Sequence, residues 1–110
     1  NFGHTLGHII ESKYQFQNIT HGESIINGML LSLKLSLYKE IISDKNYSFI
    51  MDIFNQLKIK NNYKLEKSDV EKINFDKKTT NNSIRFILLE NIGCPMICDD
   101  ISIKDILKVI

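Results

Sequence analysis

The sequence predicts a mostly α-helical (α+β) domain that carries one small antiparallel β-hairpin. Apolar residues recur at the helical spacing over much of the first half of the chain. Thr20 precedes Glu23 by three positions, the pattern of a capping box, and Ser102–Asp105 is typical of another helix start. Near the end, two apolar runs flank Asn91-Ile92-Gly93, a turn sequence typical of a hairpin.

The length and charge of the chain limit its possible roles. Its 110 residues amount to one domain or to part of one. The chain does not begin with Met, and a motif starts at the first residue, so we expect that it is cut from a longer protein. A net charge of +1 gives no argument for binding nucleic acid or an acidic membrane. No apolar run approaches the roughly 20 residues that span a bilayer, and no signal peptide is recognisable.

The first half of the chain predicts three helices. The first runs from Phe2 to about Lys13, and its glycines at positions 3 and 7 indicate close approach of another backbone or a ligand. The second runs from about His21 to Ser43 and is apolar nearly all round, as expected for a central helix. Residues 47–58 carry an amphipathic stripe and predict the third.

The second half predicts shorter elements. A capping-box match at Ser68–Glu71 indicates a short helix, and residues 75–83 indicate an exposed loop. Ile84–Leu89 and Met96–Cys98 are the expected strands of the hairpin. Ser102–Asp105 caps a final helix that runs to the end of the chain.

Cys94 and Cys98 are the two cysteines of the chain. Zinc ribbons and fingers need two close pairs, and there is no second pair here. A disulfide at this spacing in an extended segment would be strained, because the Cα atoms would lie too far apart. We therefore expect two reduced cysteines in a cytoplasmic protein.

The three histidines, His4, His8 and His21, all fall in the first fifth of the chain. His4 and His8 lie one helical turn apart, and the capping box places His21 in the first turn of the next helix. A single histidine on a helix is most often an ordinary polar residue. Neutral imidazole is, however, the commonest protein ligand for zinc-like ions and also suits acid–base chemistry, so the three together make a metal site a serious alternative.

The spacing leaves two arrangements of such a site open. All three histidines could complete a three-ligand zinc site, or His8 could transfer protons while another ligand comes from elsewhere. No glutamate lies between His4 and His8, so the pattern is not the H-E-x-x-H of the zincin proteases.

The segments NFGHTLGHIIE, HGESIINGM, DKK and IRFILL follow one another along the chain. Together they resemble the C-terminal domain of the 3-dehydroquinate synthase family. That family carries N-x-G-H-[ST]-x-G-H-x-x-E, H-G-E-x-x-x-x-G-M, D-K-K and an R-[FLV]-x-[LV]-L strand in the same order. The resemblance covers essentially the whole chain and implies that residues 1–110 form a helical domain that binds metal and substrate.

The resemblance implies a role for each matching residue. His4 and His21 match two ligands of a divalent metal, Zn²⁺ or Co²⁺. His8 matches a histidine that acts in proton transfer and hydrogen bonding near the phosphate end of the substrate. The positions that match substrate-contacting residues are Asn1 and one of Lys77 and Lys78; local sequence alone would read these lysines as part of a solvated loop.

The resemblance also implies an activity that needs a second domain. The family is a lyase of the shikimate pathway, which leads to chorismate and the aromatic amino acids. It converts 3-deoxy-D-arabino-heptulosonate 7-phosphate to 3-dehydroquinate and phosphate through transient NAD-dependent oxidation, elimination, re-reduction and aldol closure. An N-terminal α/β domain binds NAD and supplies a glutamate as the third metal ligand. This chain has no glycine-rich phosphate loop, so we expect it to be inactive alone, and the whole enzyme to be a homodimer.

Two alternatives stay open. Another sugar-phosphate cyclase, or a metal-dependent polyol dehydrogenase of the same superfamily, would share the metal histidines. The matches at Asn1 and D-K-K favour 3-dehydroquinate synthase. A catalytically inert helical fragment would retain only packing or interaction.

Overall fold

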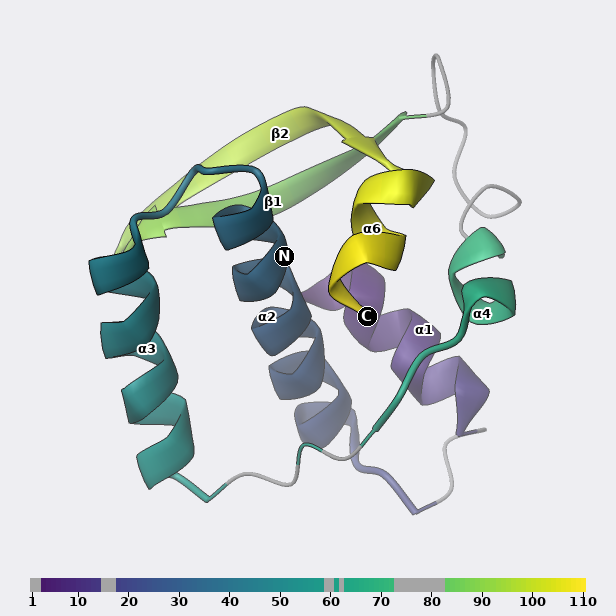
Figure 1. The fold of residues 1–110 in the computed structure, drawn as a ribbon. Helices are drawn as coiled ribbons and strands as arrows, with labels where there is room; N and C mark the ends of the chain where they lie inside the picture. The colour runs from purple at the N-terminus through teal and green to yellow at the C-terminus, as the bar shows by residue number, and fades with distance from the viewer. Residues whose placement is uncertain (1–2, 15–17, 59–60, 62, 73–82) are drawn as a thin grey trace.

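The computed structural model describes residues 3–14, 18–58, 61, 63–72 and 83–110. The elements in chain order are α1 (His4–Lys13), α2 (His21–Tyr38), α3 (Asp44–Gln56), α4 (Lys67–Glu71), β1 (Ser83–Asn91), β2 (Cys94–Ser102) and α6 (Ile103–Val109). The helices gather beneath one face of the hairpin (Figure 1). The predicted fold class, mostly helical with an antiparallel hairpin, is confirmed.

The α2 helix is the central element of the fold, as its nearly uniform apolar character predicts. It packs against α1, α3, α6 and β1. The largest buried cluster joins α1, α2 and α4 to the hairpin and α6 through Leu6, Leu35, Val70, Phe86, Leu88, Cys98, Ile101 and Ile106. Leu35 anchors the C-terminal half of α2 in this cluster.

The end of α2 differs from the prediction of a helix to Ser43. The helix ends at Tyr38, and Glu40 adopts a left-handed φ of 58°. The Glu40 amide donates to the Leu37 carbonyl oxygen at 3.0 Å, and the Ile41 amide donates to the Ser36 carbonyl oxygen at 2.9 Å. This is a Schellman motif, whose left-handed residue is usually glycine. Because glutamate occupies that position here, the sequence carries no stop signal.

The α3 helix begins earlier than predicted, at Asp44, because the Ser43 side chain accepts a hydrogen bond from the Asn46 amide at 3.1 Å. Ile50 is the buried residue of the predicted stripe. Phe49, Ile53 and Leu57 are exposed. The helix itself is confirmed, but its apolar stripe is only partly a core face.

The short helix predicted from Ser68 exists as α4, but its predicted cap is wrong. Glu66 is the N-cap residue, and its amide donates to Asp69 Oδ2 at 2.8 Å. Ser68 lies inside the helix, one position after its first residue. Asp69 thus takes the third helical position, where a carboxylate side chain can return a hydrogen bond to the cap.

The hairpin and final helix agree with the prediction. Strands β1 and β2 pair antiparallel with Leu88 opposite Met96 and Asn91 opposite Cys94, and both are longer than expected. Gly93 in the turn has a φ of 73°, a conformation that favours glycine. Ser102 caps α6 as predicted, and the structure shows that it forms a capping box with Asp105.

The two cysteines lie on β2 without a disulfide, as predicted. Cys98 is buried, and burial, together with the nearby Asp100, raises the pKa of its thiol, as expected for an unreactive core cysteine. Within the described ranges, no helix is both long and apolar enough to cross a membrane. The predicted loop falls mainly in residues 73–82, outside the described residues.

Candidate functional site

Glycines bring α1 and α2 into close backbone contact. A Cβ on Gly7 would lie 3.0 Å from the Ser24 carbonyl oxygen. A Cβ on Gly28 would lie 2.6 Å from the Gly7 nitrogen and would overlap the Gly3 carbonyl oxygen. Side chains at these positions would therefore push the helices apart. Of the two predicted reasons for glycine in the first helix, the structure bears out the approach of another backbone, that of α2.

This contact gathers the three histidines into one cluster. The ring centroids of His4 and His8 are 6.0 Å apart, and that of His21 lies 6.3 Å from each of them. His4 is partly buried, whereas the side chains of His8 and His21 are 63% and 61% exposed. The cluster therefore has a buried edge at His4 and an accessible side where a ligand can approach.

The start of α2 fixes the position of His21. The Glu23 amide donates to Thr20 Oγ1 at 3.0 Å, and the Thr20 amide donates to Glu23 Oε1 at 2.9 Å. This is the capping box predicted from the sequence. It holds the first turn of the helix, so the His21 backbone is ordered before any ligand binds.

A buried carboxylate contacts two of the three histidines. Glu11, one turn beyond His8 on α1, has a side chain that is 9% exposed. Its Oε2 lies 3.1 Å from His21 Nδ1, and its Oε1 lies 3.8 Å from His8 Nδ1. No role for Glu11 was predicted from the sequence. The sequence did contain a signal for it: an acidic residue in an apolar helical stretch, one turn after a histidine. A carboxylate buried in such a stretch needs a partner, and the histidine is a candidate.

His4 carries the one buried side-chain polar atom that lacks a hydrogen-bond partner in the described part of the chain, Nδ1. Leaving such an atom unsatisfied costs about 1–3 kcal/mol. A group that accepts a ring lone pair, such as a metal ion, or a hydrogen-bond donor would remove this cost. The residues present therefore fit a metal that binds beside His4.

These residues do not form a complete metal site by themselves. In the ranges that the structure describes, no three His, Cys, Asp or Glu side chains are grouped to hold one ion. The structure thus brings together His4, His8 and His21 but gives no support for a finished three-histidine centre. The predicted substrate-contacting residues Asn1, Lys77 and Lys78 lie outside the described residues.

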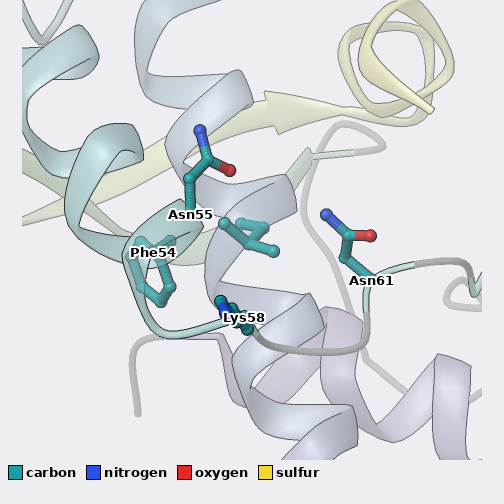
Figure 2. Close-up of a pocket in the computed structure, with 5 residues that line it drawn as sticks. Phe54, Asn55, Lys58 and Asn61 are labelled. Atoms are coloured by element: carbon teal, nitrogen blue, oxygen red, sulfur yellow. The ribbon is translucent and has the colours of Figure 1, made fainter.

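Two pockets that the described residues line lie away from the histidines. One of about 130 Å³ is lined by Leu30 of α2, Phe54 and Asn55 of α3, and Lys58 and Asn61 beyond α3 (Figure 2). Ligand pockets for small molecules usually measure roughly 300–1,000 Å³. This pocket is too small for such a ligand.

Comparisons with known proteins agree with the fold and the motifs. The family described as 3-dehydroquinate synthase C-terminal matches residues 1–79. The chain is 42% identical over 95 residues to the 3-dehydroquinate synthase of Clostridium botulinum (strain Alaska E43 / Type E3), covering 84% of this chain and 27% of that protein. It is 40% identical to the 3-dehydroquinate synthase of Clostridium tetani (strain Massachusetts / E88), covering 100% of this chain and 30% of that protein.

A solved structure shares the fold. The crystal structure of 2-deoxy-scyllo-inosose synthase complexed with carbaglucose-6-phosphate, NAD⁺ and Co²⁺ superimposes with a TM-score of 0.82 at 23% identity. The match covers 98% of this chain and 33% of that chain. The chain thus spans about a third of the length of these proteins. From the match over residues 1–79 and the shared motifs, this chain belongs to the 3-dehydroquinate synthase C-terminal family.

Proposed function

We propose that this chain is the metal- and substrate-binding part of a 3-dehydroquinate synthase. The whole enzyme would convert 3-deoxy-D-arabino-heptulosonate 7-phosphate to 3-dehydroquinate and phosphate in the cytoplasm, as a homodimer in the shikimate pathway. The observation that carries the proposal is the clustering of His4, His8 and His21 where α1 meets the start of α2. Family membership and the relatives at 42% and 40% identity support it.

His4 and His21 would hold a divalent metal, Zn²⁺ or Co²⁺, which would polarise substrate hydroxyl oxygens as a Lewis acid. The buried and unpartnered Nδ1 of His4 supports this role, because its ring lacks a partner on one side. The capping box supports the role of His21, because it fixes that residue at the helix start. A catalytic metal usually has three protein ligands, so the third would come from the NAD-binding part of the enzyme.

His8 would act on the substrate rather than on the metal. Its side chain is 63% exposed, so it can contact a bound molecule that covers the cluster. An imidazole can both donate and accept a proton near neutral pH, which suits proton transfer close to the departing phosphate. Asn1 and one of Lys77 and Lys78 would hold the polar ends of the substrate; this assignment rests on the family motifs alone.

NAD⁺ would supply transient hydride removal and return when bound to the N-terminal domain. The chain spans only about 30% of its curated relatives, and the solved cyclase of the same fold contains NAD⁺ and Co²⁺. This chain would orient the substrate and hold the metal. It would thereby contribute to catalysis by keeping the reacting groups in position. Alone, it would not catalyse the reaction.

A chimera tests this proposal directly. This chain would replace the matching region of the Clostridium tetani relative, and phosphate release from the heptulosonate phosphate would be measured with NAD⁺ and Co²⁺. We expect turnover by the chimera, none by the chain alone, and a loss of at least about 100-fold in kcat for His8→Ala. A chimera that folds and binds NAD⁺ but releases no phosphate would contradict the assignment.

The structural match to 2-deoxy-scyllo-inosose synthase favours one second candidate, another sugar-phosphate cyclase. The same assay separates the two, because under the second candidate the chimera would act on a different sugar phosphate and would release no phosphate from the heptulosonate. Turnover of the heptulosonate alone would support 3-dehydroquinate synthase.

A further inference from the structure

Glu11 is a carboxylate buried where α1 faces the first turn of α2. Its residue exposure is 7%, and neighbouring buried positions of α1 are apolar or glycine. Burying a carboxylate is unfavourable unless hydrogen bonds or charges compensate it. The partners that the described residues offer it are two histidines, His8 and His21. The cost of burying Glu11 therefore depends on whether these two rings present an N–H to its carboxylate.

The contact with His21 defines which ring nitrogen is free. Glu11 Oε2 lies 3.1 Å from His21 Nδ1, within hydrogen-bond range. An ionised carboxylate only accepts hydrogen bonds, so Nδ1 must carry the hydrogen. In a neutral ring the lone pair then lies on Nε2. A metal ligand needs that lone pair, and 61% exposure of the side chain leaves it approachable.

The second oxygen makes a longer contact. Glu11 Oε1 lies 3.8 Å from His8 Nδ1, which is beyond a hydrogen bond but within the range of an ion pair. One buried carboxylate thus lies between the ring proposed as a ligand and the ring proposed to handle protons. The shorter contact is the one that can fix a ring orientation.

From this geometry we infer that Glu11 is a positioning residue that holds His21 in the Nδ1–H tautomer and presents its Nε2 to the metal. The inference rests on the metal site of the proposed function. Glu11 acts through His21 and does not itself bind the ion. Outer hydrogen-bond partners of this kind typically contribute 10–100-fold to metal affinity.

Two measurements on the full chain test this inference. Long-range ¹H–¹⁵N correlation spectra at about pH 8.5, where an ordinary histidine is neutral, report the tautomer of His21 without any metal. Competition titration with Zn²⁺ alone reports affinity. The variants are Glu11→Ala, which removes the acceptor, and Glu11→Gln, which keeps an acceptor oxygen but loses the charge. Asp52→Asn on the exposed side of α3 controls for net charge, and circular dichroism controls for folding.

We expect the Nδ1–H tautomer in the wild-type chain and in Glu11→Gln, and a mixture or the Nε2–H form in Glu11→Ala. Zn²⁺ affinity should fall about 10–100-fold in Glu11→Ala, less in Glu11→Gln, and not in Asp52→Asn. A wild-type His21 in the Nε2–H form would overturn the inference, as would a Glu11→Ala affinity within twofold of wild type.

The test separates this inference from the proposed function. If Zn²⁺ affinity in Glu11→Ala fell as completely as in His21→Ala, Glu11 would be a ligand and the positioning role would be overturned. If the wild-type chain bound no Zn²⁺, the proposed metal site would fail, and the tautomer spectra alone would decide whether Glu11 orients His21.

Discussion

Gly28 of α2 and Gly7 of α1 meet backbone to backbone, so that a Cβ on Gly28 would lie 2.6 Å from the Gly7 nitrogen. The same nitrogen donates to the Gly3 carbonyl oxygen at 2.8 Å, in the first turn of α1. The turn that carries His4 is therefore built against the middle of α2. The histidine cluster therefore requires small residues where α1 and α2 cross.

The first prediction concerns this crossing. Gly28→Ala should destabilise the fold by about 1–3 kcal/mol, the usual cost of overpacking, although alanine favours a helix by about 1 kcal/mol. The atoms it meets belong to backbone and cannot rotate away. Urea unfolding followed by circular dichroism measures the change.

Gly22→Ala is the matched control for the same chemical change in the same helix. The nearest atom to its Cβ would be Thr20 Oγ1 at 4.0 Å, so this variant should be as stable as wild type or more stable. Equal stability of Gly28→Ala and Gly22→Ala would show that the close crossing does not exist.

The second prediction concerns the cap that holds His21. Thr20→Ala removes the acceptor of the Glu23 amide and should cost about 1 kcal/mol. Because the first turn of α2 would fray, Zn²⁺ binding should weaken as well. Ser43→Ala removes the corresponding cap of α3 and should cost a similar amount without changing Zn²⁺ affinity. A similar loss of Zn²⁺ affinity in both variants would count against a local role for the Thr20 cap.

The third prediction concerns pH and the contact between α1 and α4. Lys13 Nζ lies 3.0 Å from Asp69 Oδ2. Burial alone would raise the pKa of Asp69, but the hydrogen bonds from the Glu66 amide and from Lys13 outweigh it and hold that pKa below its ordinary value. The folded state therefore favours the ionised carboxylate. Its contribution is complete above the unfolded-state pKa near 3.9 and is lost as the pH falls through the folded-state pKa.

Asp69→Asn should accordingly cost about 1 kcal/mol at neutral pH, a modest value because solvent screens part of the pair. The difference from wild type should shrink once the pH drops below about 4. Thermal unfolding from pH 7 down to pH 2.5 measures it, with the exposed Asp52→Asn as control. A difference that stays constant over this range would contradict the paired carboxylate.

The sequence was sufficient for elements whose signals are local. The Thr20–Glu23 and Ser102–Asp105 patterns each marked a helix start that the structure confirms. The sequence was insufficient where a residue adopts a backbone conformation that is unusual for its residue type. Glu40 takes a left-handed conformation that a Schellman motif usually reserves for glycine, so the end of α2 carried no readable signal.

The candidate site, too, was predictable only where its signals are local. Spacing alone put His4 and His8 on one turn and His21 at a helix start, but their approach to 6.0–6.3 Å depends on how α1 crosses α2. That crossing depends on Gly28, which lies far from the first block of the motif. Glu11 was missed for a related reason: the local pattern shows an acidic residue in an apolar stretch, but its burial and its partner on α2 follow from the packing of α2 over α1.

A Zn²⁺ titration of the wild-type chain beside its three single histidine variants tests the proposed metal site most directly. If His4 and His21 are the ligands and His8 serves the substrate, His4→Ala and His21→Ala should each lose at least about 10-fold in affinity. His8→Ala should stay within about twofold of wild type, at micromolar Zn²⁺ for the wild-type chain. An equal loss in all three variants would instead indicate a three-histidine site, and indifference of the wild-type chain to Zn²⁺ would contradict a metal site altogether.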